Sequence, residues 1–483
     1  MKATRPNALL RRRALLTLAA AGLLSACATP PSTPLSTPSA DAQPPIVFVH
    51  GNGDTAALWT TTLWRWESNG WPRARLHAVD FPNPSARDDN GVAQPGRSSA
   101  DEQMQHLAAE VDKVLAATGA VKVVLMGNSR GGNAIRHYIA NWKEGGGGAA
   151  KVSHAILGGT PNHGVWSNPG FRPNNEFNGA GPFLTALNAP KGPNGDEVTP
   201  GVQWMTIRSD NNDKFAQPDG VWIGAKGTPT NVTFDGPALR GATNLVLPGR
   251  DHREVSYHPE AFAAAFRFVT GRAPATTATA NGAWHVVPQD SVSLSGQVTG
   301  FTTGGPSNLP LAGARLQVFA TDAATGERRG AALVDQTIGA DGRWGPLRTD
   351  SRTPLEFVLE PPASVPGFVT SHTYRAPFAR STDILQLRPE RAIADADKDA
   401  AALVSFTRPR AYFGLPRDVV LINGEPAPGI PPGVAGVATA KRKFSAAGQA
   451  VTGEFRSGVI TERITGRTWP AAERRVTVLE LHE

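Results

Sequence analysis

One turn limits the folds open to this chain more than any other feature. Residues 121–126 form an apolar, β-branched run that predicts a buried strand, and Gly127-Asn-Ser129-Arg-Gly131 follows it directly. An apolar pattern at helical spacing starts immediately afterwards. Ser129 is therefore expected on a nucleophile elbow, a sharp strand-to-helix turn that projects its hydroxyl into a cleft. The flanking glycines fit this turn, because side chains there would collide with the neighbouring backbone.

The first 26 residues have the organisation of an export signal. Five basic side chains, Lys2, Arg5 and Arg11 to Arg13, precede an apolar run over residues 14–24. That run is too short to cross a bilayer as a stable helix, and a basic start before a short apolar stretch is typical of a signal peptide. We therefore predict a signal peptide over residues 1–26. The Arg12-Arg13 pair leaves both the general secretory route and the twin-arginine route open.

Cys27 is the only cysteine of the chain, so an internal disulfide is excluded. It ends the tetrapeptide Leu24-Ser-Ala-Cys27, which resembles a bacterial lipobox. This resemblance implies that Cys27 carries a lipid and becomes the first residue of an exported lipoprotein anchored to a membrane. Ala28 in place of aspartate implies, by the same likeness, the outer membrane or cell surface. An ordinary cleaved signal, with a periplasmic or secreted product, is the alternative.

The charge of the chain argues against nucleic acid as a partner. The formal net charge is +7, but five basic residues and no acids precede Cys27, so the chain without its signal carries +2. No cluster of basic and interleaved aromatic residues remains in it. Residues 27–45, rich in proline, serine and threonine, cannot bury apolar surface and are predicted to form a tether.

Residues 46–272 alternate strand and helix patterns, which predicts an α/β fold with a mostly parallel sheet covered by helices on both faces. Ser99 and Glu102 form a capping box before a long helical pattern. Active residues of such sheets lie in loops after the carboxyl ends of strands. The strands are expected at residues 46–49, 76–81, 121–126, 155–157, 202–207 and 244–247.

Helical periodicity disappears after residue 272. Residues 273–290 are predicted to be a linker, residues 291–362 a β-sandwich and residues 363–483 a second β-rich domain. Alternation over residues 292–298 and the Asp341-Gly342 turn resemble the carboxypeptidase regulatory-like β-sandwich. An Asn423-Gly424 pair predicts a hairpin turn in the last part of the chain.

A serine hydroxyl becomes a good nucleophile only when a neighbouring base removes its proton. In folds with this elbow the partners follow in the order Ser, Asp, His, and His252 follows the last strand of the α/β region. Asp210, Asp213 and Asp219 lie in the loop after the preceding strand. The stretch from Asp213 to Gln217-Pro218 resembles the acid loop of certain lipases, which favours Asp213, with Asp210 as the alternative. A solvated turn or a weak calcium site is the non-catalytic alternative for these acids.

Acyl transfer also needs two backbone N–H groups that bind the developing oxyanion. One is expected from Arg130, directly after the serine. The other is expected from Asn52, which follows His50-Gly51 at the end of the first strand. The assignment of Asn52 rests on a likeness to lipases with a His-Gly-X motif at this place. A glycine turn that only starts the next helix is the alternative.

Residues 46–272 resemble α/β-hydrolases of the secreted bacterial lipase and esterase kind. The likeness rests on His50-Gly51, the serine elbow, Thr160-Pro161-Asn-His163-Gly164 and the late His252. It implies a triad of Ser129, Asp213 and His252 that hydrolyses carboxylic esters through an acyl-serine. His163 precedes the acid in the chain and is expected to be structural. The sequence offers no persuasive metal or organic cofactor site.

Residues 164–200 form an insertion that is too long and too rich in glycine, asparagine and proline for a plain turn. It is predicted to be a lid or a wall of the acyl pocket, with a packed surface excursion as the alternative. Apolar walls would favour apolar ester substrates. An amidase, an acyltransferase, an extracellular polyester depolymerase and an inactive surface-binding lipoprotein are the other functions considered. The apolar residues of the insertion are Trp166, Phe171, Phe177, Phe183, Leu184 and Leu187.

Overall fold

The computed structural model describes residues 43–275, 286–434 and 436–483. These residues belong to one compact unit. The predicted signal peptide, Cys27, almost all of the tether and the middle of the predicted linker lie outside the described residues.

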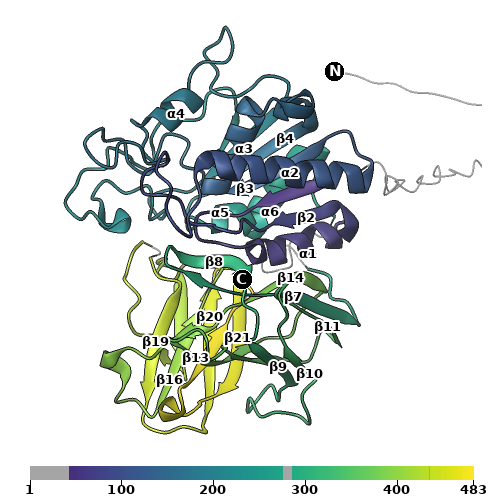
Figure 1. The fold of residues 1–483 in the computed structure, drawn as a ribbon, viewed down its shortest axis with the longest axis vertical. Helices are drawn as coiled ribbons and strands as arrows, with labels where there is room; N and C mark the ends of the chain where they lie inside the picture. The colour runs from purple at the N-terminus through teal and green to yellow at the C-terminus, as the bar shows by residue number, and fades with distance from the viewer. Residues whose placement is uncertain (1–42, 276–285, 435) are drawn as a thin grey trace, which may run out of the picture. The chain divides into compact units, whose positions relative to one another are not determined.

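A sheet of parallel strands forms the centre of the N-terminal region, as the alternating pattern predicted (Figure 1). Its strand order is β2-β1-β3-β4-β5-β6, with every neighbouring pair parallel. The central strands are buried on both faces, which explains their continuous apolar sequence. The bounds are β1 Ile46–Val49, β2 Leu76–Val79, β3 Val123–Asn128, β4 Val152–Gly158, β5 Gln203–Arg208 and β6 Thr243–Val246.

The strand bounds differ from the sequence prediction at several ends. β3 begins at Val123, because Val121 is 86% exposed and precedes the sheet. β4 begins at Val152, three residues before the predicted start, because the half-buried polar residues Ser153 and His154 interrupt the apolar run. β2 ends at Val79, and Phe81 is buried in the loop that follows it.

Helices cover both faces of the sheet, and each face has its own apolar core. Phe48 of β1 packs in one core with Trp66 and Phe262, whereas Val49 beside it packs in the other with Leu107. The alternation of side chains along a strand therefore separates the cores. The capping box of Ser99 and Glu102 is present at the start of α2, as predicted. The bounds are η2 Ala56–Trp59, α1 Thr60–Ser68, α2 Ala100–Thr118, α3 Arg130–Asn141, α4 Pro182–Leu187, α5 Glu254–Tyr257 and α6 Pro259–Thr270.

The C-terminal region is built from β-strands, and its largest sheet has the order β10-β9-β12-β13-β22-β16-β19. β12 and β13 pair directly, so this sheet continues across residues 362 and 363, where the sequence had suggested a domain boundary. β14 returns to pair with β7, and Asn423-Gly424 turns the chain between β17 and β18. The bounds are β7 Val292–Thr302, β8 Gly305–Pro310, β9 Arg315–Ala320, β10 Val334–Thr337, β11 Arg343–Thr349, β12 Leu355–Glu360, β13 Phe368–Arg375, β14 Thr382–Leu387, β15 Glu390–Arg391, β16 Ala402–Thr407, β17 Asp418–Ile422, β18 Glu425–Pro426, β19 Thr439–Phe444, β20 Ala450–Ser457, β21 Ile460–Arg467 and β22 Arg475–Glu480.

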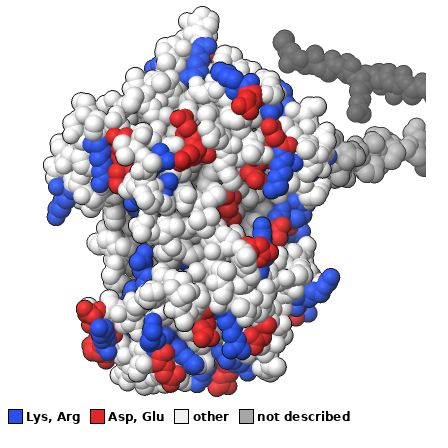
Figure 2. All heavy atoms as spheres, in the orientation of Figure 1, with Lys and Arg blue, Asp and Glu red and all other residues white. Residues whose placement is uncertain are grey.

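The β-rich region packs against the α/β region through buried side chains. Trp64 of α1 is buried among apolar residues of the β-rich region that include Val292 and Trp344, and its indole N–H donates to the Ser381 carbonyl at 3.0 Å. Ala411 reaches the core under α1 and α6. On the face drawn in Figure 2, basic and acidic side chains are intermixed. No helix in the described part of the chain has the length and apolar character needed to cross a bilayer.

Candidate active site

Ser129 occupies the strained turn that the sequence predicted between β3 and α3. Its backbone angles, φ of 51° and ψ of −120°, lie in a region that residues other than glycine rarely adopt. A Cβ on Gly131 would lie 2.5 Å from the Val49 carbonyl oxygen, and one on Gly127 would lie 2.9 Å from the Gly131 backbone. Glycine is therefore needed on both sides of the serine. The Ser129 side chain is half-buried, and its hydroxyl forms no hydrogen bond within residues 43–275, 286–434 and 436–483.

The structure brings Asp213 and His252 together. Nδ1 of His252 lies 2.9 Å from both carboxylate oxygens of Asp213, and both residues are buried. A carboxylate oxygen accepts a hydrogen bond here, so Nδ1 is the nitrogen that carries the hydrogen and Nε2 is left with its lone pair. The edge of the imidazole packs against Phe215, with ring centroids 4.6 Å apart. The Asn128 amide donates to the His252 carbonyl at 3.3 Å, which ties the elbow to the histidine loop.

Asp210 and Asp219 serve other parts of the same loop. Asp210 accepts hydrogen bonds from the backbone of Gly249 at 2.9 Å and from the Asn212 amide at 2.7 Å. Burial by itself would raise the pKa of Asp210, but these hydrogen bonds hold that pKa below its ordinary value. Asp219 accepts from the backbone of Val221 in a turn. No group of three His, Cys, Asp or Glu side chains spaced to hold a metal ion occurs among the described residues.

Two backbone N–H groups, those of Asn52 and Arg130, have no acceptor among the described residues. Of these, the N–H of Arg130 belongs to the first residue of α3. His50 shapes the Asn52 loop: its Nε2 accepts from Phe81 N–H at 3.1 Å, so Nδ1 donates to the Gly51 carbonyl at 2.8 Å. Burial lowers the pKa of His50, which keeps this ring neutral. The two predicted oxyanion donors are thus available for a ligand.

The Arg130 side chain has a role that the sequence pattern did not indicate. Its Nε and Nη2 donate to the two carboxylate oxygens of Glu176 at 2.5 and 2.8 Å, and both side chains are almost completely buried. Arg130 also donates to the Ser98 hydroxyl and the Pro84 carbonyl, both at 3.0 Å. The residue after the serine therefore anchors the insertion of residues 164–200 to the elbow. Immediately before this insertion, His163 pairs with Glu197, near the end of the insertion, at 3.1 Å.

Ser129, His252 and Asn52 line one cavity of about 200 Å³. Val165, Trp166 and Phe177 of the insertion contribute to its wall, whereas Phe183 packs on His137 away from it. The insertion thus forms part of the pocket wall. The cavity is bounded by two kinds of side chain. The aromatic ones are Trp166, Phe177, Phe215, Trp222 and Tyr412, and the charged ones are Asp54, Arg87, Asp88, Arg97, Arg172 and Arg253.

Two family models match the chain. The model described as alpha/beta hydrolase fold matches residues 44–175, which include the elbow, and that of the lipase C-terminal domain matches residues 290–392. The chain has the α/β-hydrolase fold. Residues 291–362, which resembled a carboxypeptidase regulatory-like sandwich, fall inside the range of the lipase C-terminal domain. The two matches support a hydrolase that acts on carboxylic esters.

Solved structures similar to this chain include two lipases and a phospholipase. Lipase B of Aspergillus fumigatus is 19% identical, with 48% of this chain and 54% of that chain covered and a TM-score of 0.32. The Bacillus licheniformis lipase BlEst2 in its propeptide form is 15% identical, with 90% and 95% covered and a TM-score of 0.34. The phospholipase PlaB of Legionella pneumophila is 12% identical, with 73% and 94% covered and a TM-score of 0.33.

Sequence reasoning missed two residues of the hydrolase site. Glu176 gave no signal, because a single acid in a polar insertion has no recognisable pattern. Tyr412 lines the cavity from the β-rich region, 160 positions after His252 in the sequence. A contact between such distant segments produces no recognisable pattern in the sequence around either residue.

Proposed function

We propose that this protein is a serine carboxylic ester hydrolase whose triad is Ser129, His252 and Asp213. The observation that carries the proposal is the buried His252–Asp213 pair, whose histidine lines the same cavity as a serine on a strained elbow. A salt bridge that served stability alone would require neither the strained serine nor two free backbone N–H groups beside it.

The residues present account for each proton transfer of ester hydrolysis. On substrate binding, the Ser129 hydroxyl turns to Nε2 of His252, gives up its proton and attacks the ester carbonyl carbon. Asp213 holds the imidazole in the required tautomer and stabilises the imidazolium. The backbone N–H groups of Asn52 and Arg130 bind the oxyanion of the tetrahedral intermediate. The imidazolium then protonates the leaving alcohol as its bond to carbon breaks, and water releases the acid by the same steps in reverse order.

The substrate we propose is an ester with an apolar acyl group. Three aromatic side chains, Trp166, Phe177 and Phe215, line the same cavity as Ser129 and suit an apolar acyl chain. Charged residues that also line this cavity, among them Arg87 and Arg172, suit a polar or solvated alcohol group. Amides, polymeric polyesters and a binding role without catalysis are the competing outcomes of the test.

Labelling with a fluorophosphonate probe tests the triad directly. Wild-type protein is expected to be labelled, Ser129→Ala is expected not to be, and Ser351→Ala, in a turn of the β-rich region, serves as the matched control. Initial rates on p-nitrophenyl esters of graded length, on the matching anilides and on polyester films then rank the substrates. Folded wild-type protein that is neither labelled nor active on any of them would contradict the proposal and favour a binding module.

We also propose that Cys27 is lipidated and anchors the exported enzyme, with the outer membrane or cell surface as its place. The support is the lipobox-like Leu24-Ser-Ala-Cys27 after a basic and apolar leader. Metabolic labelling with a radioactive fatty acid checks this, because the label should disappear in Cys27→Ser. Equal labelling of both forms would contradict the anchor.

A further inference from the structure

The loop that carries His252 is closed by two buried carboxylates. Asp251 accepts the backbone N–H groups of Arg253 at 2.7 Å and Glu254 at 2.8 Å, and its own N–H donates to the Glu254 carboxylate at 3.0 Å. These reciprocal bonds fix the backbone on both sides of His252, immediately before the short helix α5. Both carboxylates are completely buried, so the histidine loop carries two negative charges out of contact with water.

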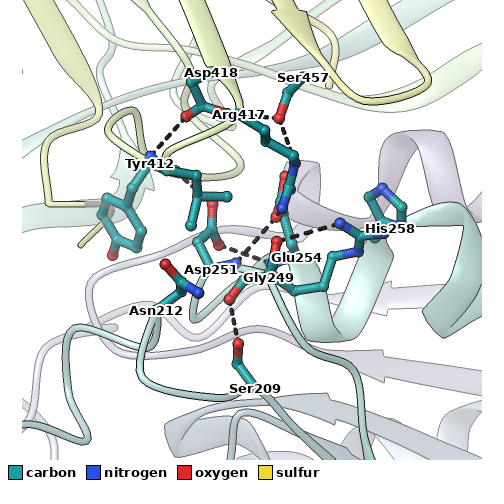
Figure 3. Close-up of polar contacts among 12 residues, drawn as sticks. Ser209, Asn212, Gly249, Asp251, Glu254, His258, Tyr412, Arg417, Asp418 and Ser457 are labelled. Carbon is teal, nitrogen blue, oxygen red and sulfur yellow. Dashed lines mark hydrogen bonds and ion pairs between the residues drawn. The ribbon is translucent and has the colours of Figure 1, made fainter. Parts of the chain in front are cut away.

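The positive charges that balance them come from the β-rich region. Arg408 is fully buried and donates to Glu254 at 2.7 Å and to Asp251 at 3.4 Å. It also donates to the Tyr257 hydroxyl at 3.0 Å. Arg417 donates to the other oxygen of Glu254 at 2.7 Å (Figure 3). Buried carboxylates without such partners would repel each other or take up a proton.

The directions in which the pKa values of Asp251 and Glu254 shift agree with this balance of charges. Burial and the neighbouring Glu254 raise the pKa of Asp251, while Arg408 lowers that of Glu254 against the effect of its burial. The loop that carries His252 would therefore not keep both Asp251 and Glu254 ionised without Arg408. Its conformation depends on the arginine that enters from 154 positions further along the chain.

The same segment of the β-rich region reaches the cavity itself. The Tyr412 backbone N–H donates to Asp251 at 2.9 Å, and the Tyr412 ring lines the cavity that holds Ser129. Nζ of Lys214, the residue after the triad acid, lies 3.5 Å from the centre of that ring. Arg253 donates to the Pro409 carbonyl at 2.9 Å. Residues 408–417 thus contact the chain on both sides of the His252–Asp213 pair.

We propose that residues 408–417 are a component of the active site, with Arg408 as a positioning residue for His252 and Tyr412 as a wall of the substrate pocket. The inference rests on the proposed function, since it assigns how the base of that triad is held. A displacement of a catalytic group by about 1 Å costs about 10²-fold in rate. The loop between β16 and β17 therefore supports catalysis through His252, in addition to covering part of the α/β region.

Three arginine variants of the full chain test the positioning role. Arg408→Gln removes the charge, and Arg408→Lys keeps it. The matched control Arg380→Gln breaks another pair between the two regions, in which Arg380 donates to Glu67 of α1 at 2.9 Å. The measurements are kcat and KM on one p-nitrophenyl ester, at a temperature well below the unfolding midpoint of each variant.

We expect Arg408→Gln to lower kcat by about 10²-fold with KM nearly unchanged, because the base is misplaced while the pocket is kept. Arg408→Lys should recover most of that loss, and Arg380→Gln should keep the wild-type kcat. If Arg408→Gln does not fold, Arg417→Gln takes its place, because Arg417 is partly exposed and contacts the same carboxylate. The kcat of Arg417→Gln should then fall below that of the wild type while its KM stays nearly unchanged.

Tyr412→Ala gives the second readout, and it should change KM and the preferred acyl length more than kcat on the smallest ester. Wild-type kcat in a folded Arg408→Gln or Arg417→Gln would overturn the positioning role, as would an equal loss in Arg380→Gln. An unchanged acyl preference in Tyr412→Ala would overturn the role of the tyrosine. Inactive wild-type protein would instead contradict the proposed function itself.

Discussion

The bidentate pair of Arg130 and Glu176 offers the sharpest test of how the insertion is held. The perturbation is Glu176→Gln, which keeps the shape of the side chain and one acceptor but removes its charge. Arg130 would then keep its hydrogen bonds to Ser98 and Pro84 while its buried charge lost the only carboxylate it contacts among the described residues.

The magnitude follows from the burial of the pair. The Arg130 and Glu176 side chains are 1% and 2% exposed, so water cannot solvate the charge that remains. Breaking such a buried pair from one side costs about 3–5 kcal/mol of unfolding free energy. We expect a value at the lower end, about 3 kcal/mol, because the glutamine still accepts one hydrogen bond.

Urea unfolding followed by tryptophan fluorescence measures this loss, and the exposed pair of Arg315 and Asp335 is the matched control. That pair has the same bidentate geometry, at 2.9 and 2.8 Å, but its side chains are 50% and 46% exposed. Asp335→Asn should therefore change stability little. The reasoning would be refuted if Glu176→Gln were as stable as the wild type, or if the two substitutions cost the same.

Two further predictions concern the proposed triad acid and the buried carboxyl of Glu462 in β21. Asp213→Asn should lower kcat by about 10⁴-fold, because the imidazole loses the acceptor that fixes its tautomer, whereas Asp210→Asn should lose much less; equal losses in steady-state assays would reverse the assignment. Burial raises the pKa of Glu462 from 4.5 to about 7, against hydrogen bonds from the backbone of His482 and Glu483. The folded protein then binds this proton more tightly than the unfolded chain, so the stability that the group contributes is present below about pH 4.5 and is lost as the pH rises through about 7. Glu462→Gln should remove that loss, and thermal unfolding midpoints at about pH 5 and pH 8 would show no such change if Glu462 were already ionised.

Local patterns were enough to predict the elbow, the order of strands and helices and the capping box of α2. Each depends on residues within a few positions of one another, through strand alternation, helical spacing or the steric demands of glycine. The position of His252 after the last strand was readable for the same reason, because parallel strands bring the loops at their carboxyl ends to one edge of the sheet. The sequence by itself thus determined the α/β region and the place of the serine that we propose as its nucleophile.

The tertiary structure decided which side chains meet at that place. Asp210 and Asp213 differ by three positions in one loop, and only the folded loop directs one to His252 and the other to Gly249. Arg130 meets Glu176 across 46 positions, and Glu254 meets Arg408 across 154. Such pairs satisfy burial and charge only after distant segments have packed together, and no short-range spacing in the sequence records them.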